Sequence, residues 1–317
     1  MHVPTLADIE AAAARIAPHV RRTPALRLTP PLCPALPLRQ GGLVLHLECL
    51  QVAGSFKPRG AFNTLLQLAP EALARGVATA SGGNHGMALA YAARALGVPA
   101  AIYVPASTGE AKRAAIAALG AGVTVHGEVW DDADLAARAY AAEHGLAYVH
   151  PFADPRVIAG QGTVGLDLLA ATPTPATVLV AIGGGGLAAG VALALRARAP
   201  GVRLVGVEPE GAPTLQQSLA AGHPVRLERI ATAAGTLAPR RTDALNFAII
   251  RDCFDRVVVV SDAAMREAAR YLWREAALAT ELSGAATLAA LHSGAYVPAP
   301  DEEVVAIVCG AGSDGCT

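Results

Sequence analysis

Lysine is rare in this chain, and one lysine lies in a segment suited to covalent chemistry. Of the 25 basic residues only Lys57 and Lys112 are lysines. Arginine stays protonated in proteins, whereas a lysine amine that has lost its water shell can form a Schiff base. Lys57 lies between Phe56 and Pro58, in a crowded turn that could bury its amine. Lys112 lies on a periodic helix face, where we expect a solvated charge. The alternative is an arginine-rich composition that left a lysine in a loop by chance.

The segment Ser81-Gly-Gly-Asn-His85 is suited to binding an anion. It follows a predicted strand, its small residues let a ligand approach the backbone, and the amides that begin the next helix point outward. Such a loop could hold a carboxylate, while the Asn84 side chain hydrogen-bonds an oxygen on a ring. The alternative is an ordinary turn in which Asn84 caps the helix.

Four consecutive glycines, from Gly183 to Gly186, precede Leu187. Glycine amides ahead of a helix form a concave nest that fits a phosphate. The Gly-Lys-Ser/Thr ending of a Walker A loop is missing. A Gly-x-Gly-x-x-Ala match from Gly184, with Glu208 ending the next predicted strand, leaves a Rossmann-type NAD oxidoreductase as a competing hypothesis.

Cys309 follows the last predicted strand, in Cys-Gly-Ala-Gly-Ser-Asp. A free cysteine usually packs as a small buried hydrophobe, and the functional alternative is a weak thiol partner for a ring nitrogen. The cysteine count is odd and contains no Cys-x-x-Cys pair, which predicts reduced thiols and a cytoplasmic protein. The five cysteines are at positions 33, 49, 253, 309 and 316.

The bulk composition favours a small-molecule partner. A length of 317 residues allows about two domains, and a net charge of −1 with mixed signs gives no basic stripe for nucleic acid. The first residues show no secretory signal. Residues 176–195 carry no charge over the length of a membrane span. Because their glycine run is a poor helix former, we predict a buried strand, a loop and a buried helix there instead.

Alternating strands and helices must position these segments. Short β-rich runs separated by helical patterns predict an α/β fold with parallel βαβ units and helices on both faces of the sheets. A proline-rich segment, 22–31, should be extended. The predicted helices span 6–17, 58–68, 85–96, 109–119, 131–143, 159–170, 187–198, 213–221, 262–278 and 284–292. The predicted strands span 43–48, 77–80, 100–104, 123–126, 147–150, 178–182, 203–208, 256–260 and 304–309.

Together these segments resemble the fold type II, tryptophan synthase β-like family of pyridoxal-phosphate enzymes, and within it the branch of threonine/serine dehydratases and serine racemases. The resemblance extends over the chain. It rests on Arg22-Thr-Pro, Gly-Ser-Phe-Lys57-Pro-Arg-Gly-Ala, Ser81 to His85, Gly183 to Leu187, Val207-Glu-Pro-Glu, Glu281-Leu-Ser-Gly-Ala and Val308-Cys-Gly-Ala-Gly. It implies two open, mostly parallel sheets with the active site between two domains. The larger domain would comprise 1–70 and 151–317, and the smaller one 71–150.

The resemblance also implies roles for individual residues. Lys57 would bind pyridoxal 5'-phosphate covalently and later move the Cα proton of the substrate. Asn84 would hydrogen-bond the O3' oxygen of the cofactor. The remaining implied cofactor contacts are Phe56, Gly183, Gly184, Gly185, Gly186, Leu187, Glu281 and Cys309. The substrate carboxylate would be held by Ser81, Gly82 and the amides of Asn84 and His85.

Three departures from the family pattern decide the expected chemistry. Serine racemases of this branch resemble one another in a second serine, an acid/base on the opposite face of the ring, where this chain has Gly82. One-sided proton transfer favours elimination over racemisation, and we expect Gly82→Ser to gain racemisation. Cys309, a neutral thiol, would leave the ring nitrogen largely unprotonated, which favours loss of the β-hydroxyl. The branch's divalent-metal site would use Glu208, the Ala212 carbonyl and an acidic residue where Thr214 stands, so we expect no bound metal.

The sequence therefore predicts a pyridoxal-phosphate ammonia-lyase that converts L-threonine, L-serine or a close β-hydroxy amino acid to a 2-keto acid and ammonia. Alternatives within the family are a serine racemase and a 3-hydroxyaspartate dehydratase. The resemblance suggests a homodimer, and no regulatory domain is expected after Cys309.

Overall fold

The computed structural model describes residues 2–28 and 42–316. Cys33 and the last part of the proline-rich segment, 29–31, lie outside the described residues. The earlier part of that segment forms a strand, β1 (Ala25–Leu28). The extended conformation predicted for it is therefore confirmed where the structure describes it.

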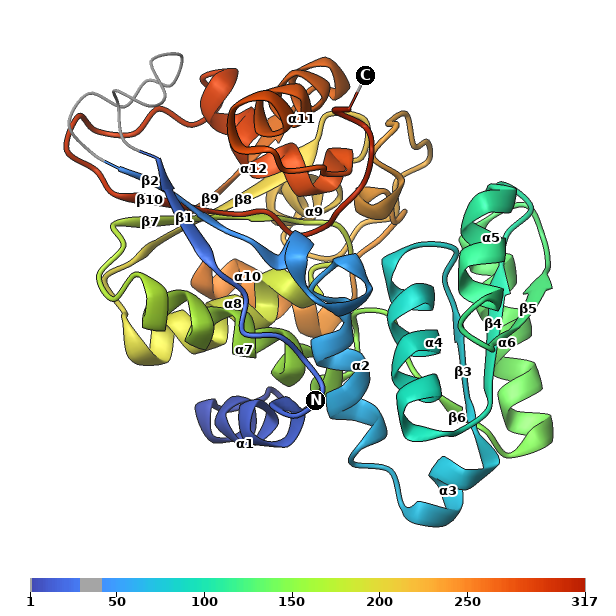
Figure 1. Ribbon diagram of the computed structural model, residues 1–317. Coiled ribbons are helices and arrows are strands. Elements are labelled where there is room, and N and C mark those ends of the chain that lie inside the picture. Colours follow the sequence, from blue (N-terminus) through green and yellow to red (C-terminus); the bar gives the residue numbers. More distant parts are fainter. Residues whose placement is uncertain (1, 29–41, 317) are drawn as a thin grey trace.

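Two sheets organise the chain (Figure 1). The larger has six strands in the order β1-β2-β10-β7-β8-β9, parallel except that β1 runs antiparallel to β2. Its strands after β1 are β2 (Leu43–His46), β7 (Thr177–Ala181), β8 (Arg203–Pro209), β9 (Arg256–Val260) and β10 (Val304–Ile307). The smaller has four parallel strands in the order β5-β4-β3-β6. They are β3 (Val77–Ala80), β4 (Ala100–Val104), β5 (Gly122–Val125) and β6 (Ala147–Tyr148). This confirms the predicted α/β class with two mostly parallel sheets.

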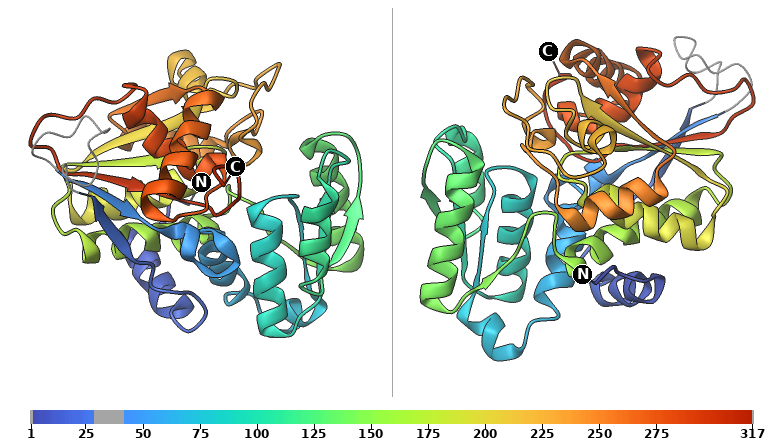
Figure 2. Two further views of the ribbon diagram at one scale, coloured as in Figure 1. Left: turned by 45° about the horizontal axis from the view of Figure 1, so that its top comes forward. Right: turned by 180° about the vertical axis from the view of Figure 1, so that it is seen from behind.

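Helices cover both faces of each sheet (Figures 1 and 2). On the larger sheet, α11 (Asp262–Ala276) and α12 (Leu282–His292) lie on one face. The other face carries α7 (Pro155–Ala171), α8 (Gly186–Arg198) and α10 (Ala244–Cys253), with α1 (Leu6–Ile16) packed outside α7. The smaller sheet lies between α4 (Asn84–Leu96) with α5 (Glu110–Ala117) and α6 (Trp130–His144). The others are α2 (Lys57–Leu65), α3 (Pro70–Arg75) and α9 (Thr214–Ala221).

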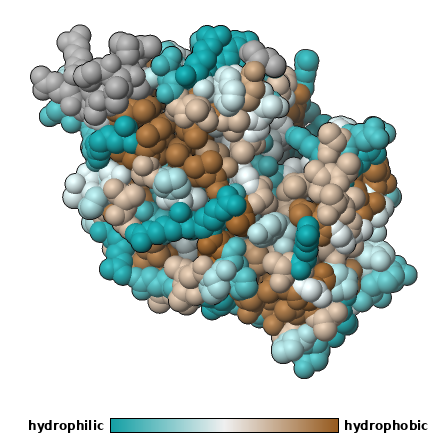
Figure 3. Space-filling model, in the orientation of Figure 1, coloured by the Kyte–Doolittle hydropathy of each residue, from teal (hydrophilic) through white to brown (hydrophobic). Residues whose placement is uncertain are grey.

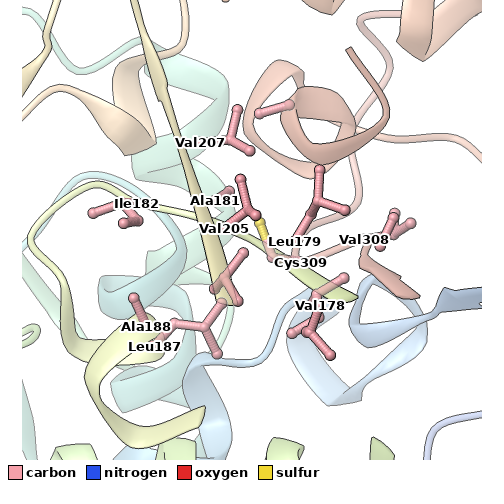
Figure 4. Close-up of a cluster of buried hydrophobic side chains, with 14 of the residues drawn as sticks. Val178, Leu179, Ala181, Ile182, Leu187, Ala188, Val205, Val207, Val308 and Cys309 are labelled. Carbon is pink, nitrogen blue, oxygen red and sulfur yellow. The ribbon is translucent and has the colours of Figure 1, made fainter. Parts of the chain in front are cut away.

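The centre of the larger sheet is buried on both sides. Strands β7 and β10 are buried at every position, as expected for parallel strands covered by helices. Figure 4 shows the β7 side chains Val178 and Leu179 packed with residues of β8 and α8, and the sulfur of Cys309 lies among these side chains. The uncharged segment 176–195 is thus a buried strand, a loop and a buried helix, as predicted. In the part of the chain that the structure describes, no helix is long and apolar enough to cross a membrane.

A buried ionic cluster fixes the start of α2 beneath the sheet. The guanidinium of Arg59 donates from Nε to Glu48 Oε2 at 2.8 Å and from an Nη to Asp167 Oδ2 at 2.8 Å. Burial opposes ionisation of Glu48, but the neighbouring Arg59 outweighs it and lowers the pKa of Glu48 to about 2. The cluster therefore ties α2 to the 3-10 turn that follows β2 and to α7.

Each predicted strand exists, with ends shifted by one or two residues at most, but some helices differ. The helix predicted at 159–170 begins at Pro155, because the Asp154 side chain accepts the Arg156 N–H and caps an earlier turn. Helices α3 and α10 were not predicted. The sequence does contain a residue typical of a helix start for α10, because Asp243 caps this helix by accepting the Leu245 N–H.

Candidate active site

A cavity of about 830 Å³ opens between the two sheets, at the carboxyl ends of their strands. Loops after β3, β4, β6, β7 and β10 line it, which is where ligands bind in open α/β sheets. The structure brings every residue predicted for the cofactor or the substrate carboxylate to this cavity. These lining residues are Phe56, Lys57, Ser81, Gly82, Asn84, His85, Gly183, Gly184, Gly185, Gly186, Leu187, Glu281 and Cys309.

The Lys57 amine is placed as a nucleophile. Its Nζ donates to the carbonyl oxygen of Pro151 at 2.6 Å and lies 5.1 Å from the centroid of the Phe56 ring. Burial lowers the pKa of Lys57 to about 8. About a tenth of the amine is therefore neutral one pH unit below this pKa, far more than for a solvated lysine with its usual pKa of about 10.4. Its partner Pro151 was not predicted, because a backbone carbonyl carries no pattern in the sequence.

Local structure holds Lys57 in place from both sides. It begins α2, with Pro58 in the first turn, where a missing N–H costs nothing. The preceding residues pair with the loop after β10, through a bridge between Ser55 and Gly310 and a bond from Phe56 N–H to the Cys309 carbonyl at 3.3 Å. The segment that leads into Lys57 and the loop that contains Cys309 therefore hold each other in position.

Cys309 is buried and remains a thiol. Its Sγ donates to the Ser283 carbonyl oxygen at 3.4 Å. Burial raises the pKa of Cys309, with the nearby Glu281 acting in the same direction. The group expected beside a ring nitrogen is therefore neutral.

Glu281 is the centre of a polar cluster that joins the two sheets. Its Oε1 accepts hydrogen bonds from Asn84 Nδ2 at 2.7 Å and from Thr236 Oγ1 at 3.2 Å, and the Ser283 hydroxyl also donates to it. Burial raises the pKa of Glu281. Asn84 begins a helix of the smaller sheet, whereas Glu281 precedes α12 on the larger one. Thr236, which the sequence did not single out, completes the cluster.

The glycine loop is shaped to let a ligand reach backbone amides. Gly185 has φ +91°, a conformation that favours glycine, and it leads directly into α8. A Cβ on Gly186 would lie 2.7 Å from the Phe152 carbonyl oxygen. Asn246, on the unpredicted helix α10, donates to the carbonyls of Gly184 at 2.8 Å and Phe152 at 3.0 Å. The first amides of α8 have no partner within the helix, so this end of α8 is suited to an anion.

In the loop from Ser81 to His85, the backbone is available to a ligand in the cavity, whereas the histidine side chain is not. The Ser81 hydroxyl accepts the Gly83 N–H at 3.3 Å, and α4 begins at Asn84. The His85 ring is buried, with Nε2 3.3 Å from the Val149 carbonyl oxygen, and burial lowers its pKa well below the usual value. Its imidazole is therefore neutral and packed inward.

Glu208 and Ala212 do not line the cavity. The buried Glu208 carboxylate accepts the N–H groups of Leu215 at 2.7 Å and Gln216 at 2.9 Å at the start of α9. Burial raises its pKa to about 7. Among the described residues, no group of three or more His, Cys, Asp or Glu side chains is arranged to hold a metal.

Comparison with known proteins agrees with this geometry. Residues 16–310 match the family described as pyridoxal-phosphate dependent enzyme. The chain belongs to this family. Within it, the chain is similar to the L-threonine ammonia-lyase of Geobacter sulfurreducens, with 43% identity over 252 residues that cover 79% of this chain and 63% of that protein. The chain thus spans less than two thirds of that relative's length.

Solved structures of pyridoxal-phosphate enzymes share the fold. The structure of maize serine racemase has a TM-score of 0.92 and 34% identity, and the match covers 98% of this chain and 94% of that one. The structure of a threonine deaminase from T.th. has a TM-score of 0.89 and 40% identity, with coverage of 97% and 98%. Lyases and a racemase are therefore both similar to this pyridoxal-phosphate enzyme.

The cavity fits pyridoxal phosphate on its own features. A part-buried amine of lowered pKa is available for an aldehyde, the amides at the start of α8 for a phosphate, and the Cys309 thiol for a ring nitrogen. A side chain at Gly186 would collide with the backbone of Phe152, so the loop can keep this conformation only with glycine there. The Rossmann alternative requires Glu208 at a ribose, but Glu208 caps α9 instead.

Proposed function

We propose that this chain is a pyridoxal-phosphate ammonia-lyase that converts L-threonine, L-serine or a close β-hydroxy amino acid to a 2-keto acid and ammonia. The observation that carries the proposal is the Lys57 amine, held at 2.6 Å by the Pro151 carbonyl in a cavity that also contains the glycine loop. Similarity to named threonine ammonia-lyases supports this substrate class.

We assign the steps to this chain's own residues. When bound, pyridoxal phosphate supplies an aldehyde for an amine and an electron-withdrawing ring that makes the Cα proton acidic. The amides from Gly183 to Leu187 would hold its phosphate, and Cys309 would meet its ring nitrogen as a neutral thiol. Ser81, with Gly82 and the amides of Asn84 and His85, would hold the substrate carboxylate. The Lys57 amine, displaced by the substrate amine, would accept the Cα proton, after which the β-hydroxyl leaves.

The test uses the two lysines of the chain. The purified protein should be yellow, and borohydride should bleach it and fix the cofactor to the peptide that contains Lys57. Lys57→Ala should abolish colour and 2-keto acid release, because no other amine occupies that position. Lys112→Ala is the matched control. Lys112 is exposed on α5 as expected, although it also lines the cavity, and its loss should leave the cofactor attached.

A cofactor fixed to Lys112, or colour retained without Lys57, would contradict the assignment. Release of ammonia from a panel of β-hydroxy amino acids then identifies the preferred substrate. A chelator should leave this release nearly unchanged, because Glu208 is engaged by the α9 amides.

We also infer a two-domain homodimer located in the cytoplasm. The smaller sheet is formed wholly by strands within 77–148, which supports a domain of 71–150 inserted into one of 1–70 and 151–317. The cysteines at 49, 253, 309 and 316 are free thiols, which supports a reducing compartment.

On the face shown in Figure 3, hydrophilic residues are interspersed with hydrophobic ones. Light scattering of the purified protein tests the dimer directly.

A further inference from the structure

Thr108 fills the space that a side chain at position 82 would need. A Cβ built on Gly82 would lie 2.2 Å from Thr108 Oγ1, 2.6 Å from its Cγ2 and 2.9 Å from its Cβ. All three nearest atoms belong to this one side chain. The Thr108 hydroxyl, from a residue 26 positions later in the chain, therefore lies within 2.2 Å of the point where a side chain at position 82 would begin.

Thr108 lines the cavity and is held by local structure. Thr108 lies in the loop between β4 and α5, where its N–H donates to the Pro105 carbonyl oxygen at 2.9 Å. The side chain is 9% exposed and lines the cavity. Within 2–28 and 42–316, no hydrogen-bond partner of its Oγ1 is found. A polar group in an enclosed site without a protein partner is available to a ligand.

Lys57 and Thr108 reach the cavity from different sheets. Lys57 begins α2 and pairs with the loop after β10 of the larger sheet, whereas Thr108 follows β4 of the smaller sheet. A substrate carbon between these two walls would have an amine on one side and a hydroxyl on the other.

We propose that Thr108 is a second proton-transfer residue, and that it gives this enzyme a side activity, exchange of the Cα proton and formation of the D-enantiomer. The inference rests on the proposed function, because it needs the same substrate in the same cavity. It differs from the expectation, drawn from the sequence, that Gly82 makes proton transfer one-sided.

In the side reaction, every proton that is removed is replaced. Lys57 takes the Cα proton on one side, and the Thr108 hydroxyl gives its own proton to Cα on the other, so that the substrate keeps its β-hydroxyl. Water then returns a proton to the Thr108 oxygen and removes one from the Lys57 ammonium. One proton of the substrate is exchanged for one of the solvent, and no electron is transferred.

The steric part is tested without activity, by thermal unfolding of the cofactor-free protein. Gly82→Ser alone should lower the midpoint temperature of unfolding, because its Cβ collides with Thr108. The same change made in a Thr108→Ala background should lower that temperature much less. Gly109→Ser is the matched control, since a Cβ there has no atom within 4 Å and Gly109 is exposed in the same loop. Equal losses for Gly82→Ser with and without Thr108 would overturn the placement.

The chemical part is tested with L-serine in deuterium oxide. The wild-type holoenzyme should release ammonia, and recovered serine should carry deuterium at Cα and include the D-form. Thr108→Val, similar in shape but without a hydroxyl, should reduce D-serine formation about 100-fold, the usual contribution of a positioned acid or base. Thr108→Ser should retain it, and all variants should still release ammonia.

The outcomes separate the two proposals. Ammonia release with D-serine formation that Thr108→Val leaves unchanged, or with none in the wild type, would overturn the role of Thr108 and leave the lyase standing. Absence of ammonia release from every β-hydroxy amino acid would instead remove the proposed function. Loss of D-serine in Thr108→Val with recovery in Thr108→Ser would support the inference, since a structural role alone does not distinguish these variants by their hydroxyl.

Discussion

The Lys57 amine is the group whose state should control reactivity, and its pH dependence can be predicted. Burial lowers the pKa of Lys57 to about 8, so half of the amine is neutral at that pH. The neutral fraction approaches one about one pH unit above this pKa. In the cofactor-free protein, the rate of labelling of Lys57 by an amine-directed reagent should fall about tenfold for each pH unit below that value. Peptide mapping separates it from Lys112. A midpoint near 10 would show that the amine is solvated.

At the scale of residues, the sequence was informative where chemistry requires a particular side chain. Lys57 stood out because lysine is scarce, and Ser81 to His85 and Gly183 to Gly186 stood out through small residues at strand ends. Partners that act through a backbone carbonyl or through space could not be found this way. The carbonyl of Pro151 carries no sequence signal, and Thr108 contacts Gly82 only because β3 and β4 are neighbours in the sheet.

At the scale of elements, the entry to α8 should tolerate no side chain. Gly186→Ala places a Cβ 2.7 Å from a backbone oxygen of Phe152, which cannot move as a side-chain end could. We expect a loss of about 1–3 kcal/mol of stability, as for other overpacked sites, and at least about tenfold weaker cofactor binding, measured by unfolding and by an absorbance titration.

Gly201→Ala is the control for this prediction. Gly201 has no atom within 4 Å of a built Cβ and follows α8 on the exposed surface, so both measurements should stay near wild type. Wild-type behaviour of Gly186→Ala would mean that the loop retreats from Phe152 without consequence.

Element boundaries were predicted best where hydrophobic periodicity and turn residues agree, as in β3, β4 and β9. They were predicted worst where capping decides. The short α10 has an Asp243 cap and a largely apolar run, but it lies between irregular stretches that hid its pattern. Missing α10 also hid Asn246, whose amide ties the glycine loop to Phe152. A site built from several loops can be predicted in full only when every helix or strand that supports those loops has a recognisable sequence pattern.

At the scale of the whole molecule, Trp130 should report what enters the space between the sheets. Its Nε1 donates to the Ala80 carbonyl oxygen at 2.8 Å, its ring centroid is 6.1 Å from that of Phe152, and it lines the cavity. Titrating the cofactor-free protein with pyridoxal phosphate should therefore quench tryptophan fluorescence. The only other tryptophan, Trp273, lies on α11 and is 43% exposed.

Trp273→Phe should leave this quenching intact, whereas Trp130→Phe should remove most of it. Quenching that survives in Trp130→Phe would place the ligand elsewhere.

The strand order of the larger sheet has a consequence for how the protein is made. The strand made last among those described, β10, lies in the middle of that sheet, between β2 and β7. A nascent chain on the ribosome therefore cannot complete this layer until β10 has been translated. Until then the apolar edges of β2 and β7 stay exposed or are shielded by chaperones. The strands of the smaller layer are contiguous in the chain and can assemble well before β10 is made.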